Sequence, residues 1–184
     1  MEVGFIEEIP VQKWDEEHYL LHRPVVKKSG TTRVRTVFDA LVRERGQPSV
    51  NQCLQKGVNL IEIMTAILLR FRLHRIEIIA DITKAFLQIS PRMRPGFPQV
   101  LWFNKEGDLK IFQHARVTFG VINSPFLLGA VIDFHLKMYN EGSEVTTEYT
   151  RSTTEKLRRG LYANNFVTSV ENERELRLFI KKAH

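Results

Sequence analysis

The chain has 184 residues, enough for one domain or for one lobe of a larger enzyme, and its 43% hydrophobic and 26% charged residues are ordinary for a soluble globular protein. A net charge of +6 is compatible with a polyanionic partner but does not establish one. One cysteine excludes an intrachain disulfide, and we find no signal peptide and no apolar run of membrane-spanning length. We therefore expect an intracellular location and no membrane partner.

The N-terminal part of the chain predicts a lead-in followed by a basic hairpin. Residues 1–21 mix aromatic and polar side chains and are predicted to be a loop-rich lead-in segment. Strands at 24–28 and 33–38 are predicted on either side of a Ser-Gly-Thr-Thr turn. Arg33 and Arg35 alternate with other residues and should face the same side of the hairpin. That side is either a phosphate-binding surface or a solvated basic face.

The middle of the chain predicts a helix and then a strand that ends in an acid. Residues 39–58 are predicted to be irregular, and an apolar stripe predicts a helix from Leu60 to Phe71. A nearly continuous apolar run with the β-branched residues Ile76, Ile78 and Ile79 then stops at Asp81. A carboxylate in this place is either a metal ligand or the N-cap of the short helix that follows.

Hairpins and helices alternate in the rest of the chain. In order they are strands at 99–103 and 109–117, a helix from Ser124 to about Tyr139, two short strands within 161–170, and a helix over 173–183. Ser124 is predicted to be the N-cap of its helix, and Asn164-Asn165 to form the hairpin tip, because Asn tolerates positive φ. No secondary structure is predicted for residues 143–158. The order predicts an α+β fold with an antiparallel sheet backed by helices.

Four segments, taken in chain order, carry a resemblance to a known family. They are HRPVVKKSGTTRVRTVFDA (22–40), IIADITKAFLQI (78–89), VTFGVINSPFL (117–127) and LYANNFVTS (161–169). In this order the chain resembles the reverse transcriptase of long-terminal-repeat retrotransposons, most closely the BEL/Pao group. The resemblance implies an RNA-directed DNA polymerase, a nucleotidyltransferase that uses Mg²⁺ or Mn²⁺, a nucleic-acid primer–template and a deoxynucleoside triphosphate.

The resemblance also implies a domain organisation. Residues 22–184 would form a partial reverse transcriptase domain with the fingers and palm of a right-hand polymerase. The fingers hairpin would span about 22–40 and the palm motifs about 75–170. The chain would be truncated after its terminal helix, with the thumb absent. We therefore expect a weak grip on a primer–template duplex.

The resemblance assigns roles to individual residues. Asp81 would be a catalytic metal ligand, and Asn164 and Asn165 would stand at the positions of the family's paired catalytic aspartates. The nucleotide-binding residues implied by the resemblance are Arg35 and Lys28 at the triphosphate, Phe86 under the sugar, and Phe119 and Gly120 in the nucleotide pocket.

The pair Asn164-Asn165 departs from the family pattern. Two formal negative charges are lost where two divalent ions would have to bind, and Mg²⁺ prefers anionic oxygen ligands. We therefore expect a severely impaired or inactive polymerase. Two other hypotheses stay open. The chain is either a non-catalytic remnant that binds nucleic acid or a transposon fossil without function.

Overall fold

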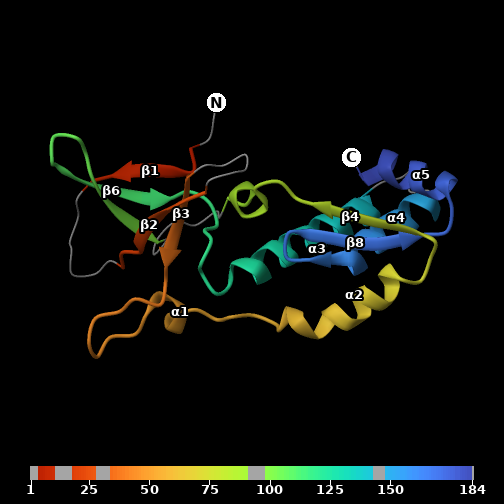
Figure 1. Ribbon diagram of the computed structural model, residues 1–184, viewed down its shortest axis with the longest axis horizontal. Helices are drawn as coiled ribbons and strands as arrows, with labels where there is room; N and C mark the ends of the chain where they lie inside the picture. Colours follow the sequence, from red (N-terminus) through yellow and green to blue (C-terminus); the bar gives the residue numbers. More distant parts are fainter. Residues whose placement is uncertain (1–3, 11–17, 28–33, 91–97, 143–147, 184) are drawn as a thin grey trace. The chain divides into compact units, whose positions relative to one another are not determined.

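The computed structural model describes residues 4–10, 18–27, 34–90, 98–142 and 148–183 (Figure 1). The chain forms two compact units, each built from two separate stretches of sequence. Unit 1 comprises Met1–Lys56 and Phe86–Ser124, and unit 2 comprises Gly57–Ala85 and Pro125–His184. In the described parts of the chain, every helix is too short or too polar to cross a membrane.

Unit 1 contains a three-stranded antiparallel sheet with the order β1-β6-β5. The strands are β1 (Ile6–Ile9), β6 (Leu109–His114) and β5 (Gln99–Phe103). The β5–β6 hairpin confirms the prediction, although β6 ends at His114 rather than at residue 117. The prediction of a loop-rich lead-in missed β1, because four residues before a proline give too short an alternating pattern.

A second antiparallel pair in unit 1 is the predicted basic hairpin. It consists of β2 (Leu21–Val26) and β3 (Val34–Asp39), with Val25 opposite Arg35. The predicted turn and Arg33 lie outside the described residues. The hairpin leads into a small core, whose buried residues and the partly buried hydrophobic residues packed on them are Leu20, Ala40, Val121, Phe38, Val50 and Leu54.

A short helix, α1 (Val50–Cys53), lies in the region that was predicted to be irregular. Ser49 and Gln52 form a capping box. The Ser49 hydroxyl accepts from the Gln52 backbone N–H at 3.3 Å, and the Gln52 side chain accepts from the Ser49 N–H at 2.9 Å. The sequence Ser-x-x-Gln is a helix-start signature, so the signal for α1 was present in the sequence.

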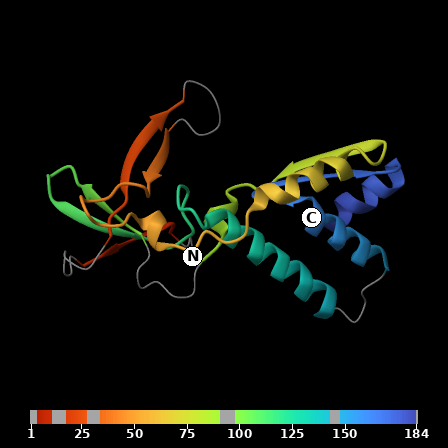
Figure 2. The ribbon, with the colours of Figure 1, turned by 90° about the horizontal axis from the view of Figure 1, so that it is seen from below.

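Unit 2 is built on a sheet with the order β4-β8-β7, again antiparallel. The strands are β4 (Ile76–Asp81), β8 (Asn165–Val170) and β7 (Leu161–Tyr162). The central strand β8 contacts three helices, α2 (Met64–Phe71), α4 (Glu148–Gly160) and α5 (Glu173–Ala183) (Figures 1 and 2). The predicted antiparallel pairing with helical backing is confirmed, but the strands form three small sheets rather than one.

The helices of unit 2 follow the prediction except for α4. The predicted helix over 60–71 begins as a 3₁₀ turn, η2 (Leu60–Ile63), and continues as α2. The terminal helix agrees with the prediction over its whole length. Helix α4 was missed because its buried side chains include Thr153 and Thr154, which are poor indicators of an apolar helix face.

Helix α3 (Ser124–Gly142) starts where the sequence predicts. The Ser124 hydroxyl donates to the Thr118 carbonyl at 2.7 Å, so it ties the helix start to the preceding segment. The predicted helix start is therefore confirmed, and the capping role of Ser124 stays a prediction.

Candidate functional site

The end of the β4–β8 ladder brings together three residues that the sequence singled out. Asp81 is the last residue of β4 and lies opposite Asn165, the first residue of β8. The backbone N–H of Ile82 donates to the Asn164 carbonyl at 2.9 Å, which continues the contact one step beyond the strands. The antiparallel register therefore places one carboxylate and two amides at one end of the sheet.

Hydrogen bonds join the three side chains in a chain of donors and acceptors. The Asn164 Nδ2 donates to Asp81 Oδ2 at 2.6 Å, and the Asn165 Nδ2 donates to Asn164 Oδ1 at 3.4 Å. An ionised carboxylate offers only acceptors, whereas an amide supplies N–H donors. The amide of Asn164 thus partly satisfies the charge of Asp81 by a charge-assisted hydrogen bond.

The reading of Asp81 as a helix N-cap is wrong. The next helical segment, η3 (Ala85–Gln88), starts four residues after Asp81. A turn in which the Ala85 N–H donates to the Ile82 carbonyl at 3.2 Å separates the two, and Lys84 in that turn has φ 53°. Asp81 is therefore free of a capping role and its side chain faces Asn164.

The β7–β8 turn lies where the sequence predicts, but the residue with positive φ is not one of the two asparagines. Ala163 has φ 51°, whereas neither asparagine of the turn has positive φ. The expectation that an asparagine would take the left-handed conformation was therefore wrong. Asn164 and Asn165 instead use their side chains in the hydrogen-bonded cluster.

The donor set of this cluster contains one anionic group. Asp81 supplies a carboxylate, while Asn164 and Asn165 supply neutral amide oxygens. In the residues that the structure describes, no group of three or more His, Cys, Asp or Glu side chains is placed to hold a metal ion.

Two of the predicted nucleotide-binding residues contact each other in unit 1. The rings of Phe86 and Phe119 meet edge to face, with centroids 5.1 Å apart and planes at 80°. Phe119 is 46% exposed, so the pair is accessible from solvent. Edge-to-face contacts of this kind fix the mutual orientation of aromatic rings.

Gly120 follows directly and has a backbone conformation that requires glycine. Its φ is +86°, and a Cβ at this position would lie 2.6 Å from the Phe38 carbonyl oxygen. The side chain of Asn51 holds the same turn, because its Nδ2 donates to the Gly120 carbonyl at 3.3 Å and its Oδ1 accepts from the Ile122 N–H at 2.8 Å. Asn51 is a positioning residue that the sequence did not reveal, because its partners lie about 70 residues away along the chain.

Arg35 lies on the exposed hairpin, while Lys28 falls outside the described residues. Arg35 is opposite Val25, and side chains two residues apart on a strand share a face, so Arg35 and Arg23 lie on one side. Lys27, just past the end of β2, continues the same alternation. The described part of the hairpin therefore presents a row of cations.

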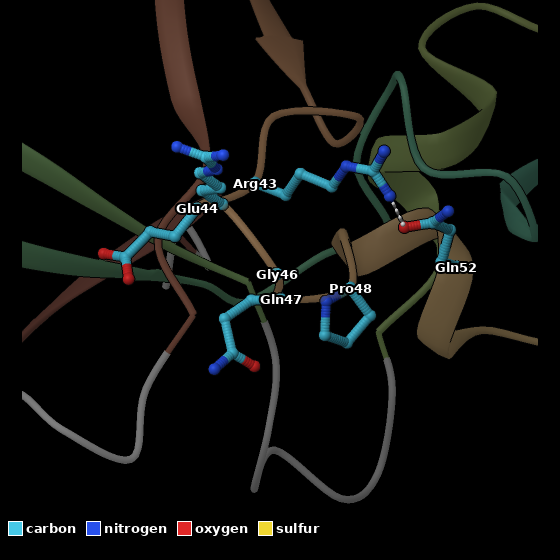
Figure 3. A pocket seen from close by; sticks show the side chains of 7 residues that line it. Arg43, Glu44, Gly46, Gln47, Pro48 and Gln52 are labelled. Atoms are coloured by element: carbon cyan, nitrogen blue, oxygen red, sulfur yellow. Dashed lines mark hydrogen bonds between the residues drawn. The ribbon is translucent and has the colours of Figure 1, made fainter.

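A pocket of about 780 Å³ in unit 1 is unrelated to the predicted site residues (Figure 3). It is lined by the loop from Arg43 to Pro48 and by Gln52. The Arg43 guanidinium donates to Gln52 Oε1 at 3.0 Å, and Figure 3 shows Glu44 and Gln47 directed away from this bond. The loop is exposed throughout, which makes this pocket an open surface feature.

No protein-family model matches the chain, and no curated protein matches it. Among solved structures, its fold is similar to two crystal structures of prototype foamy virus protease–reverse transcriptase. The TM-score is 0.64 to the selenomethionine-labelled CSH mutant and 0.62 to the native protein, with 17% and 18% sequence identity. The chain has a reverse transcriptase-like fold. Each alignment covers 98% of this chain and 20% of the viral chain, so the chain spans about a fifth of the viral protein's length.

Proposed function

We propose that this chain is the fingers and palm part of a retrotransposon reverse transcriptase of the BEL/Pao type, with severely impaired polymerase activity. The reverse transcriptase-like fold and the order of the four sequence segments support the family. The observation that carries the impairment is the hydrogen bond from Asn164 Nδ2 to Asp81 Oδ2. An amide donor stands where the family pattern has a second carboxylate.

The impairment follows from the charge balance at the cluster. Polymerases of this family use two divalent ions, and Mg²⁺ favours anionic oxygens. Asp81 is the one anionic member of the cluster, and Asn164 Nδ2 already occupies one of its oxygens. These residues do not fit a pair of Mg²⁺ or Mn²⁺ ions. Loss of positioned transition-state stabilisers typically lowers rates by orders of magnitude.

We propose that the nucleotide-binding residues retain their family roles in unit 1. Arg35, together with Lys28, would contact the triphosphate, because guanidinium groups match phosphate oxygens. Phe86 would lie under the sugar, and Phe119 and Gly120 would line the pocket. The edge-to-face contact of the two phenylalanines and the glycine-specific turn support this assignment.

A second candidate function is non-catalytic binding of primer–template. The exposed cations of the β2–β3 hairpin and the net charge of +6 favour it, because phosphate contacts dominate the affinity of proteins for nucleic acid. This function would survive the replacement of the family's paired aspartates by Asn164 and Asn165 at the β7–β8 turn.

Primer extension with Mg²⁺ or Mn²⁺ tests the impairment. The double variant Asn164→Asp/Asn165→Asp should extend a primer on an RNA template at least about 100-fold faster than the natural chain. Adding Asp81→Ala to the double variant should abolish that gain. The matched control is Asn59→Asp/Asn172→Asp, which adds the same charge at two positions where the side chain accepts a backbone N–H.

The outcomes separate the two candidate functions. If the natural chain and the double variant extend the primer equally fast, and both need Asp81, the cluster is active with its two asparagines. That result would contradict the proposed impairment. No extension by either chain, combined with salt-sensitive binding of primer–template, would favour the binding function.

A further inference from the structure

Unit 1 has a partly open cavity of about 460 Å³ whose wall is rich in rings. Its lining includes residues of the β1-β6-β5 sheet, of the β2–β3 hairpin and of the segment around Phe119. Among the described residues, twelve line it, of which seven carry an aromatic or imidazole ring and none is Lys, Arg, Asp or Glu. A volume in this range is typical of small-molecule sites, which are mostly apolar with a few polar groups.

The rings of the wall are held in fixed orientations. His22 lies nearly parallel to Trp102, with centroids 5.4 Å apart and planes at 23°. Phe38 meets His114 edge to face, with centroids 4.7 Å apart and planes at 89°. Ordered ring faces and edges of this kind suit the stacking of another planar ring.

His114 provides a polar group in this wall. It is 95% buried, with 5% of its surface exposed, and its Nε2 atom has no hydrogen-bond partner in the part of the chain that the structure describes. Its backbone is fixed by pairing with Ile6 and by donation from its N–H to the Pro98 carbonyl at 3.2 Å. Burial and the nearby His22 lower its pKa to about 4, so the imidazole is neutral at pH 7. A neutral imidazole nitrogen without a partner is an incomplete hydrogen-bonding group.

We propose that this cavity binds a small, uncharged, planar heteroaromatic molecule whose polar edge forms a hydrogen bond with Nε2 of His114. The described lining residues carry no charged side chain, which disfavours an anion and separates this ligand from a nucleoside triphosphate. The site lies within unit 1 and does not involve Asp81. It shares Phe119 with the nucleotide pocket proposed above, but its polar contact, His114, is not among the residues assigned to nucleotide binding.

Calorimetric titration of the full chain at pH 7.5 tests the proposal with a matched pair of probes. Benzimidazole presents both a donor and an acceptor, so it can bond to either tautomer of His114, whereas indene has the same shape and no polar edge. Benzimidazole should bind at least tenfold more tightly than indene. In His114→Phe, which keeps the ring contact with Phe38, that difference should disappear.

A second variant tests the cavity without removing the histidine. Thr36 lines the cavity from an exposed position of β3, so Thr36→Trp should fill the space, leave the fold intact and abolish binding of both probes. Circular dichroism would confirm that both variants are folded. The Asn164→Asp/Asn165→Asp variant should bind benzimidazole like the natural chain.

Three results would overturn the proposal. Equal affinities for the two probes, or a benzimidazole preference that persists in His114→Phe, would refute the role of Nε2. No binding of benzimidazole to the folded natural chain up to its solubility limit would refute the site itself. None of the three depends on polymerase activity.

Discussion

At position 164 an amide hydrogen points to a carboxylate, with 2.6 Å between Asn164 Nδ2 and Asp81 Oδ2. Aspartate in the same place would offer only acceptors, and two carboxylates in contact repel each other unless a cation or a proton intervenes. The asparagines therefore keep the hairpin end hydrogen-bonded without a cation. In the proposed reverse transcriptase, these hydrogen bonds would keep this end of the sheet folded with asparagines in place of catalytic acids.

His114 should make the protein less stable in mild acid. Its pKa is lowered from 6.5 to about 4 in the folded state, so the unfolded chain binds more protons between these values. The stability that the neutral ring contributes is present above pH 6.5 and is lost as the pH falls towards 4, by about 3 kcal/mol. Urea unfolding at pH 7.5, 6 and 5 measures this. His114→Phe should show a shallower fall over the same window, and an equally steep one would contradict the assignment.

Replacing Gly120 with alanine should destabilise the protein more than the same replacement at Gly107, a glycine with similar φ. Gly107 has φ +90° and open space around its missing Cβ, so Gly107→Ala tests the backbone strain alone, about 1–2 kcal/mol. Gly120→Ala adds a clash with the Phe38 carbonyl and should cost about 3 kcal/mol or more. Denaturant unfolding of the two variants measures the difference. Equal losses would show that the turn at Gly120 shifts at no cost.

At the scale of elements, α5 is held to β8 by a pair of stacked rings. Phe166 and Phe179 are each 5% exposed, with centroids 5.4 Å apart and planes at 11°. Phe179→Ala should therefore destabilise the chain by about 3–5 kcal/mol. The neighbouring Ile180 is 49% exposed, so Ile180→Ala serves as the control and should cost less than about 1 kcal/mol. Thermal unfolding followed by circular dichroism compares them, and similar losses would mean that α5 is not anchored by Phe179.

The contrast between α5 and α4 shows which elements a sequence pattern can predict. In α5 the apolar residues recur at helical spacing, and the element agrees with the prediction residue for residue. In α4 the buried positions include threonines, and ion pairs such as Glu155–Arg159, with 2.6 Å between Oε1 and Nε, lie on its surface. Oppositely charged residues spaced i,i+4, such as Glu155 and Arg159, were the sequence signal that could have predicted α4 as a helix.

At the scale of the whole molecule, the positive charge should govern any binding of nucleic acid. If Arg23, Lys27 and Arg35 each contact one phosphate, the slope of log K against log salt is about −2.7. Affinity for a primer–template duplex should then fall about 40-fold between 50 and 200 mM salt. Fluorescence anisotropy titrations measure this.

The matched variants for the salt experiment are Arg35→Ala and Lys105→Ala. The first removes a cation of the hairpin face and should reduce the slope by about 0.9, whereas the second removes one from the exposed β5–β6 loop and should leave it unchanged. Equal slopes for both variants would place the phosphate contacts elsewhere.

By itself the sequence determined the local elements, because alternation, helical spacing and turn residues act over a few positions. It predicted the hairpins, the strand ending at Asp81 and the position of the turn at Asn164, which are all present. Only the tertiary structure decided the long-range features. These are the pairing of β1 with β6, the contact of Asn51 with the Gly120 turn, and the burial of His114 in a ring-lined cavity. Each depends on residues about 70 or more positions apart, or on a packed environment that no local pattern specifies.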